Sequence, residues 1–237
     1  MIALLCLLLE ISAGPELAVR RVGFRDRLTP GLAGYQSGAL PLLRLDAAAY
    51  PARGLLAIDG FGFFGSYARS LLKSRTLTAD GSLAFETQEI AWEAGVRYRV
   101  VIDGNERLAA SLSYGSLRND FAGPRLAGVL LPAGTLQYWR PGVEGRLPLG
   151  PVVLAAGFGY LAPARQDAIG AAFPRASSGG VDLGLRAELA VGKIWLRLAA
   201  RYLRFFYSLH PLPHDPYIAG GAIDEVASAS LALGYRL

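Results

Sequence analysis

Apolar and polar residues alternate with a period of two along most of the chain. In the stretch 181–191 every odd position is Val, Leu or Ala, whereas the even positions include Asp182, Arg186 and Glu188. Successive side chains of a β-strand point to opposite faces, so a strand sorts these residues into an apolar face and a polar face. A helix would scatter the charges around its circumference. The pattern therefore predicts β-strands.

The same alternation recurs along the sequence and predicts about ten strands, with eight or twelve as alternatives. Gly60, Gly62 and Gly65 interrupt the third strand among aromatic residues, and they indicate a bulge or bend there. The expected strands are Leu8–Asp26, Leu40–Tyr50, Leu55–Arg69, Ser82–Val101, Arg107–Asp120, Gly134–Pro148, Pro151–Pro163, Ser177–Val191, Ile194–Ser208 and Ile223–Leu237.

Short and long connections alternate between these strands. The segments 51–54, 102–106, 149–150 and 192–193 are short turns. The longer segments, rich in Pro and Gly, are 29–38, 70–81, 121–133, 164–176 and 209–222. A barrel in an outer membrane has short periplasmic turns and longer extracellular loops. The connections therefore favour an all-β, transmembrane, antiparallel up-and-down barrel with both termini in the periplasm.

The apolar face could point either to a soluble core, as in a lipocalin-like barrel, or to lipid. The polar face mixes charges with Gly, Ala and Ser, which suits a crowded lumen. Trp and Tyr prefer the membrane–water interface, and aromatic residues gather near the predicted strand ends. We expect girdles formed from Tyr50, Tyr98, Tyr114, Tyr160, Trp195 and Tyr235. These observations favour lipid.

The last predicted strand runs to the end of the chain. Leu231, Leu233, Tyr235 and Leu237 lie on one apolar face. This ending resembles the C-terminal signature of bacterial outer-membrane barrels, although Leu237 stands where Phe is commoner. The resemblance implies recognition by the barrel-assembly machinery. Together with the stretch 219–225 it is also similar to small outer-membrane barrels of myxobacterial-type genomes, which implies an architecture over nearly the whole chain and no particular activity.

The N-terminus allows two interpretations within a single domain of residues 1–237. Met1–Leu9 is apolar and Ile11-Ser12-Ala13 resembles a cleavage site, but no basic residue precedes the apolar run, as signal peptides usually require. The alternation from Leu8 onward favours a first strand. Residues 1–7 would then be the remnant of a signal peptide or of a truncated upstream segment.

Composition and charge exclude several classes of protein. Although 52% of the residues are hydrophobic, no run approaches the roughly 18 apolar residues of a spanning helix. The net charge of +5 comes from basic residues that are nearly all Arg, scattered singly, so nucleic-acid binding is not expected. Cys6 is the single cysteine, which excludes an internal disulfide and a cysteine-rich metal site.

We expect no catalytic, cofactor-binding or metal-binding residues. His210 and His214 have a spacing that could bind metal, but a site needs a further ligand, and Asp215 and Asp224 are the nearby candidates within a proline-rich loop. An omptin-like protease is similar in strand count only, and His214–Asp215 is the single His–Asp couple. No Gly-x-Ser-x-Gly nucleophile motif occurs.

Charged residues concentrate on the face that we assign to the lumen. A barrel of about this size has an interior only wide enough for side chains, which favours an ion-pair network over a charged pore. The predicted network contains Glu10, Glu16, Arg44, Asp46, Asp59, Glu93, Arg97, Arg99, Glu144, Arg146, Asp182, Arg186, Glu188, Arg197, Arg201 and Arg236.

Taken together, the sequence predicts a protein of the outer membrane, of structural or interaction type, with a charge-filled lumen and no enzymatic activity. A narrow passive pore for ions or small solutes is the alternative. An enzyme acting at the extracellular rim through the 210–215 loop is a weaker one. The expected partners are the lipid bilayer and the barrel-assembly machinery, with no nucleic acid and no cofactor, and the chain is expected to be a monomer.

Overall fold

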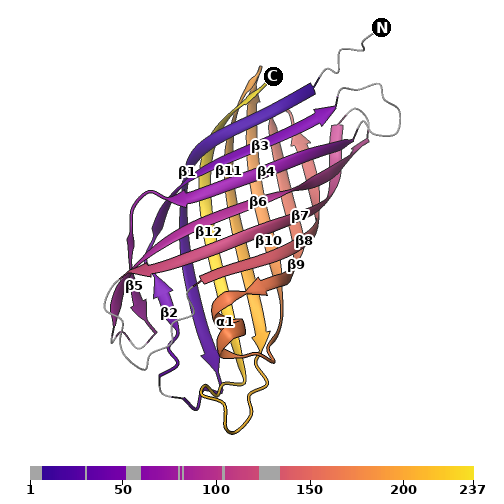
Figure 1. The fold of residues 1–237 in the computed structure, drawn as a ribbon. Helices are drawn as coiled ribbons and strands as arrows, with labels where there is room; N and C mark the ends of the chain where they lie inside the picture. Colours follow the sequence, from indigo (N-terminus) through magenta and orange to yellow (C-terminus); the bar gives the residue numbers. More distant parts are fainter. Residues whose placement is uncertain are drawn as a thin grey trace.

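Ten long antiparallel strands form a closed ring (Figure 1). The computed structural model describes residues 7–29, 31–51, 60–79, 81, 83–102, 105–122 and 134–237. Each long strand pairs with its neighbour along the chain, and β12 pairs back with β1. The ring contains β1 (Leu7–Arg25), β3 (Leu40–Pro51), β4 (Phe61–Ser70), β6 (Ala84–Ile102), β7 (Asn105–Ala122), β8 (Gly134–Leu149), β9 (Val152–Gln166), β10 (Ser177–Val191), β11 (Ile194–Ser208) and β12 (Gly221–Arg236). The predicted ten-stranded barrel is confirmed.

Both described chain ends lie at the end of the barrel that carries the short turns (Figure 1). The amide of Leu237 donates to the carbonyl of Leu9 at 2.9 Å. Gly150 and Gly192 each have φ near +63° in the tight turns between β8 and β9 and between β10 and β11, a conformation that favours glycine. Among the described longer connections, 167–176 and 209–220 lie at the opposite end (Figure 1), which is the extracellular end of such a barrel.

Two short strands extend the wall at the extracellular end. β2 (Tyr35–Ser37) pairs with β1 and with β5 (Ser74–Thr78), which in turn pairs with β6. Only residues 38–39 separate β2 from β3, and only residues 71–73 separate β4 from β5. The short strands β2 and β5 are therefore bent continuations of the wall strands β3 and β4. The sequence analysis placed both in loops, and it also missed the six-residue helix α1 (Asp167–Ala172). No helix in the described part of the chain is long and apolar enough to cross a membrane.

The bulge expected in the third strand is absent from its described part. β4 pairs with β3 and β6 without a shift in register, and the shifts lie instead at Val100/Val101 and Gln137/Tyr138. The predicted residues 55–59 lie outside the described residues. Gly62 has a packing role, because a Cβ there would stand 2.2 Å from the ring of Tyr50.

The apolar face of the wall points outward. On β10, Leu183 and Leu185 are 47% and 65% exposed, whereas Asp182 between them is 1% exposed. The same contrast holds around the ring, where the exposed apolar side chains include Ile11, Leu17, Leu45, Phe63, Leu112, Val143, Phe158, Leu198 and Leu233. Such a continuous apolar surface needs lipid to cover it.

Aromatic side chains mark the extracellular border of this band. We call the outward-facing residues Tyr67, Trp92, Tyr114, Trp139, Tyr160 and Tyr202 the extracellular girdle. The ring centroid of Tyr114 lies 5.8 Å from that of Trp92 and 5.0 Å from that of Trp139. Just beyond the girdle, the outward residues include Arg69, Arg118 and Arg204. Of the predicted girdle residues, Tyr50 and Trp195 are corrected: both point inward and are buried.

Candidate functional site

The barrel interior holds most of the buried charge, and its periplasmic part contains a chain of ion pairs. Arg146 on β8 lies 2.5 Å from Glu106 and 2.8 Å from Glu188. Arg197 on β11 continues the chain, with contacts of 2.7 Å to Glu188 and 3.6 Å to Asp46. Because the partners come from different strands, these contacts brace the wall from within.

A tighter cluster lies at mid-height. Arg201 on β11 contacts both Glu93 on β6 and Asp182 on β10 at 2.9 Å. Arg140 on β8 pairs with Asp182 and lies 3.5 Å from Glu93, which also accepts a 2.7 Å hydrogen bond from Ser113. Two arginines and two carboxylates thus alternate across the interior. Such matching is required when charges are removed from water.

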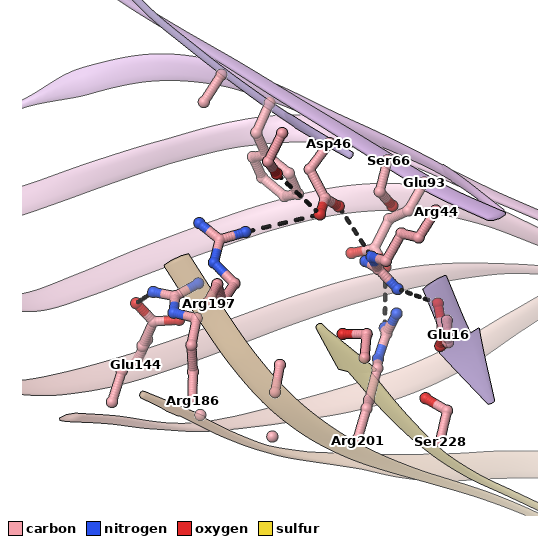
Figure 2. A pocket seen from close by; sticks show the side chains of 18 of the residues that line it. Glu16, Arg44, Asp46, Ser66, Glu93, Glu144, Arg186, Arg197, Arg201 and Ser228 are labelled. Carbon is pink, nitrogen blue, oxygen red and sulfur yellow. Dashed lines mark hydrogen bonds and ion pairs between the residues drawn. The ribbon is translucent and has the colours of Figure 1, made fainter. Parts of the chain in front are cut away.

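A cavity of about 200 Å³ lies among these charges (Figure 2). Arg44 borders it and lies between Asp46 and Glu16, at 3.0 and 3.2 Å. On the facing wall, Arg186 pairs with Glu144 at 2.6 Å. The cavity is therefore lined by paired charges beside apolar residues such as Phe64 and Trp195, and its polar groups make it suitable for water.

Three arginines near the periplasmic end stack on inward-facing aromatic rings. The guanidinium carbon of Arg99 lies 3.3 Å from the ring centroid of Tyr50, and that of Arg197 lies 4.2 Å from Trp195. Arg97 lies 5.0 Å from Phe64. Guanidinium groups stack favourably on aromatic faces. Tyr50 and Trp195, which the sequence suggested for a girdle, thus contact lumen charges instead.

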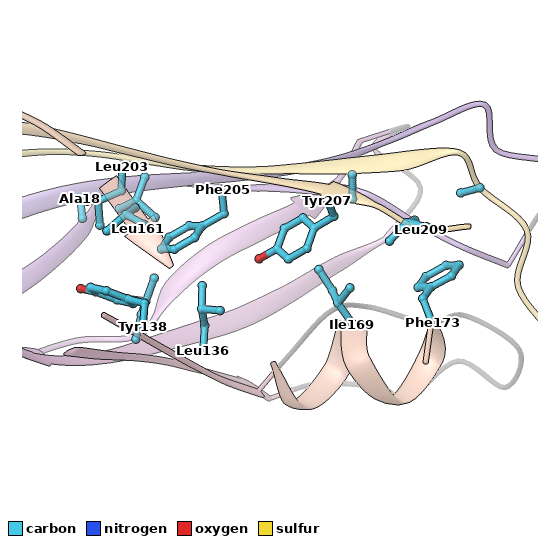
Figure 3. Close-up of a cluster of buried hydrophobic side chains, with 14 of the residues drawn as sticks. Ala18, Leu136, Tyr138, Leu161, Ile169, Phe173, Leu203, Phe205, Tyr207 and Leu209 are labelled. Atoms are coloured by element: carbon cyan, nitrogen blue, oxygen red, sulfur yellow. The ribbon is translucent and has the colours of Figure 1, made fainter. Parts of the chain in front are cut away.

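The extracellular half of the interior contains a large apolar cluster, beside buried polar groups such as Arg20, Glu89 and Asp224. We call this cluster the apolar plug; its buried residues are Ala18, Leu32, Leu40, Leu42, Leu117, Leu136, Tyr138, Leu161, Ile169, Phe173, Leu203, Phe205, Tyr207, Leu209, Ala219, Ala222 and Val226. The rings of Tyr138 on β8 and Phe205 on β11 lie 5.7 Å apart, although two strands separate β8 from β11. Figure 3 shows α1 adding Ile169 beneath this cluster, with Phe173 just after the helix.

Two ion pairs join the first and last strands of the ring. At the periplasmic rim, Arg236 lies 2.9 Å from Glu10. At the extracellular end, Arg20 pairs with Asp224, and both are buried. The amide of Arg20 also donates a 2.8 Å hydrogen bond to Ser37. The β1–β12 seam is thus bridged by charge at both ends.

The structure brings together most of the predicted network. Every described member forms an ion pair except Arg97, which stacks on Phe64, and Asp59 lies outside the described residues. Sequence reasoning missed Arg140, Glu106 and the pair Arg20–Asp224. Arg140 precedes Pro141, and Arg20 precedes Arg21, so neither stood out from the alternation. A consistent count of inward positions along β1 and β8 would have included both.

The 209–220 loop is held by polar contacts rather than arranged as a catalytic couple. Asp215 pairs with Arg175 and accepts a 2.6 Å hydrogen bond from the amide of Leu212. These two interactions lower the pKa of Asp215, with the amide hydrogen bond the larger cause. His210 shares a 3.1 Å hydrogen bond with Ser208. The described residues contain no group of three His, Cys, Asp or Glu side chains placed to hold a metal ion.

Comparisons with known proteins agree with this architecture. No protein-family model and no curated protein matches the sequence. Among solved structures, the chain is similar to the outer-membrane protease OmpT from Escherichia coli, with a TM-score of 0.53, 10% identity, and coverage of 98% of this chain and 96% of that chain. It also matches the translocator domain of the autotransporter NalP from Neisseria meningitidis, with a TM-score of 0.47, 15% identity, and coverage of 96% and 88%.

The likeness to OmpT shows the fold alone. Combined with the exposed apolar band and the girdle, it places the barrel in a lipid bilayer. The chain therefore has the fold of outer-membrane β-barrel proteins, and its site of residence is the outer membrane.

Proposed function

We propose that this barrel is a non-conducting outer-membrane protein of structural or interaction type, whose extracellular loops form its working surface. The apolar plug is the observation that carries the proposal. Side chains from both walls meet in it, and Phe205 and Leu161 are fully buried. A water-filled path would require an open gap through this cluster. The interior of a ten-stranded barrel offers little width beyond its own side chains.

Planar-bilayer recording tests the closed interior. We expect the purified chain to give no stable single-channel steps. Replacing Tyr138 and Phe205 together with Ala removes the ring contact across the plug, and we expect steps or a raised leak in that double variant. Leu198→Ala, which removes an outward-facing side chain, is the matched control and should behave as the parent. Steady single-channel conductance from the parent, unchanged in the double variant, would refute the proposal.

A narrow pore is the second candidate function, and the cavity among the lumen charges favours it. If the plug moved aside, the path would pass Arg44, Arg186 and Arg197, which line the cavity. Such a pore should prefer anions or cations according to which charge is exposed along the path. Conductance that reverses its ion preference after Arg197→Glu would favour the pore over the closed barrel.

The proposal includes no enzymatic activity. A rim enzyme would need His214 and Asp215 to act together, but the carboxylate of Asp215 is engaged by Arg175 and the Leu212 amide. OmpT is a protease, and its likeness to this chain concerns the fold. We expect no peptide cleavage by the purified chain. Hydrolysis that disappears in His214→Ala would instead establish the rim enzyme.

We also propose that the C-terminal strand acts as the assembly signal and that the barrel is a monomer without nucleic-acid partners. Leu231, Leu233 and Tyr235 alternate outward on β12, with Leu233 61% exposed. Replacing Tyr235 and Leu237 with Ser should lower the yield of folded barrel in cells while leaving refolding into detergent unchanged. Equal losses in both settings would indicate a stability effect rather than recognition.

A further inference from the structure

Outward-facing cations just beyond the extracellular girdle differ between the two sides of the barrel. On the β7–β12 side they have acidic partners: Arg118 lies 3.0 Å from Asp120, Arg165 lies 2.6 Å from Asp167, and Arg204 lies 3.8 Å from Glu225. These charges are therefore balanced locally. The arginines on the β1–β5 side differ in this respect.

On the β1–β5 side, several exposed arginines have no such partner. We call Arg21 on β1, Arg69 on β4 and Arg75 on β5 the arginine arc. None of them forms an ion pair with a carboxylate in the described ranges. The acidic residues that stand opposite Arg21 and Arg75 in the sheet contact other side chains.

Glu225 stands opposite Arg21 across the β1–β12 seam, but it accepts a hydrogen bond from Tyr202 at 2.5 Å and pairs with Arg204. Glu86 stands opposite Arg75, but it pairs with Lys73 at 2.9 Å. The arc and Lys73 thus face outward with Glu86 as their one acidic neighbour within the described part of β1–β6. This leaves a local excess of positive charge.

The pairing of the short strands brings Arg21 and Arg75 together. Arg21 pairs with Gln36 of β2, and Gln36 pairs with Leu77 of β5. Two strand spacings separate Arg21 from Leu77, which is about 10 Å. Arg75 lies two positions before Leu77 and on the same face of β5. The carbonyl of Arg75 accepts a 2.9 Å hydrogen bond from the amide of Gly38. The bend in the wall therefore brings Arg21 and Arg75 close together, and Arg69 lies six residues before Arg75, near the end of β4.

Exposed leucines lie at the same bend. Leu71 and Leu72, between β4 and β5, are 62% and 67% exposed, and Leu77 is 39% exposed. The amide of Leu71 donates to Pro41 at 2.9 Å, so the segment is fixed against β3. The bend therefore presents apolar side chains next to cations that have no carboxylate partner, and this surface is both hydrophobic and positively charged.

We propose that the arginine arc binds a phosphate-bearing lipid of the outer leaflet. Guanidinium groups pair bidentately with phosphate, and clustered cations at a membrane surface favour anionic headgroups. The exposed Leu71, Leu72 and Leu77 beside the arc add apolar contacts with the same lipid. Arg69 is the next outward residue of β4 after the girdle residue Tyr67. This position beyond the girdle matches the depth of a lipid headgroup.

The test uses the purified full chain in a neutral detergent with diphosphorylated lipid A as the probe, and native mass spectrometry counts the lipid retained. We expect the triple variant Arg21→Gln, Arg69→Gln, Arg75→Gln to bind at least tenfold more weakly. Arg118→Gln, which removes a paired arginine from the opposite side, is the matched control and should bind as the parent. Equal retention by the triple variant and the parent would overturn the proposal.

Two further arms separate the alternatives. Dephosphorylated lipid A should bind the parent weakly, and equal binding of both lipids would show that the leucines alone act, which also overturns the proposal. If sedimentation in detergent shows that the arc instead mediates self-association lost in the triple variant, a second copy is the occupant and the lipid proposal fails. Heat-modifiable migration verifies folding, and the single variant Arg75→Gln, on a short strand outside the ten-stranded ring, is used if the triple variant misfolds.

Discussion

Leu185 provides the most direct test of which face meets lipid. It lies on β10, where the outward residues run from Val181 to Val191. A tilted strand needs about 9–11 residues to cross the hydrocarbon region, so this stretch spans the membrane once and Leu185 lies near its middle. Its side chain is 65% exposed on the outer wall.

Replacing Leu185 with Arg would place a charge near the midplane. An Arg on the lipid face of a barrel costs about 2–4 kcal/mol at that depth. With a urea m-value of about 1–3 kcal/mol/M, a cost of about 3 kcal/mol lowers the unfolding midpoint by roughly 1–3 M. Reversible urea unfolding in lipid vesicles, followed by Trp fluorescence and by heat-modifiable migration, measures this shift.

Gly184→Arg is the control, because it adds the same charge one residue away on the inner face. A Cβ at Gly184 would have no atom within 4 Å, and the position borders the interior cavity. We expect it to cost less than half as much. If Leu185→Arg left the midpoint unchanged, or if the inner substitution were the more harmful of the two, the assignment of the apolar face to lipid would be wrong.

Three further outcomes follow from the interior and the loops. Gly234→Ala should destabilise the barrel by about 1–3 kcal/mol and shift Trp emission, because the new Cβ would stand 2.1 Å from the indole of Trp195. Glu93→Ala should cost about 3–5 kcal/mol in urea unfolding, since it removes one of the two buried carboxylates that Arg140 and Arg201 share. Asp215 has a lowered pKa, so its stabilisation of the loop is present above the unfolded value near 3.8 and is lost as the pH falls through the folded value. Hydrogen-exchange protection of the Leu212 amide should therefore decrease below about pH 3.8.

Each of these predictions has a counterpart that should show little effect. Gly145→Ala adds a methyl group with no atom within 4 Å and should be nearly neutral. Glu86→Gln breaks an exposed pair with Lys73 and should cost at most about 1 kcal/mol. Asp215→Asn should abolish the pH dependence at Leu212. A loss as large in these variants as in the tested ones would show general fragility instead.

The ring of strands could be predicted because each wall strand sorts its own residues. On β11, Arg197 and Arg201 alternate with Leu196 and Leu198, and no tertiary contact is needed to see it. The three-residue strand β2 and the six-residue α1 carry too few residues for any period to appear. Their structure depends on neighbours distant in sequence, so it had to come from the fold.

The apolar plug could not be predicted by the same rule. The inward positions of β11 continue from Arg201 to Leu203, Phe205 and Tyr207 without a break in alternation. The face therefore stays inward while its chemistry changes from polar to apolar, because the wall leaves lipid at the girdle. A rule that equates apolar with outward holds only within the membrane. Arg204, outward beyond the girdle, shows the matching change on the other face.

The charges at the β1–β12 seam affect both the closing of the barrel and its sideways opening. The two strands are the first and last of the ring, so their pairing comes from the most distant parts of the chain. Until they meet, Arg20 and Asp224 each lack the partner that compensates burial. Separating the finished strands would again leave each buried charge without this partner. A sideways opening of the wall, by which molecules could leave the lumen into the membrane, is therefore most strongly opposed at this seam.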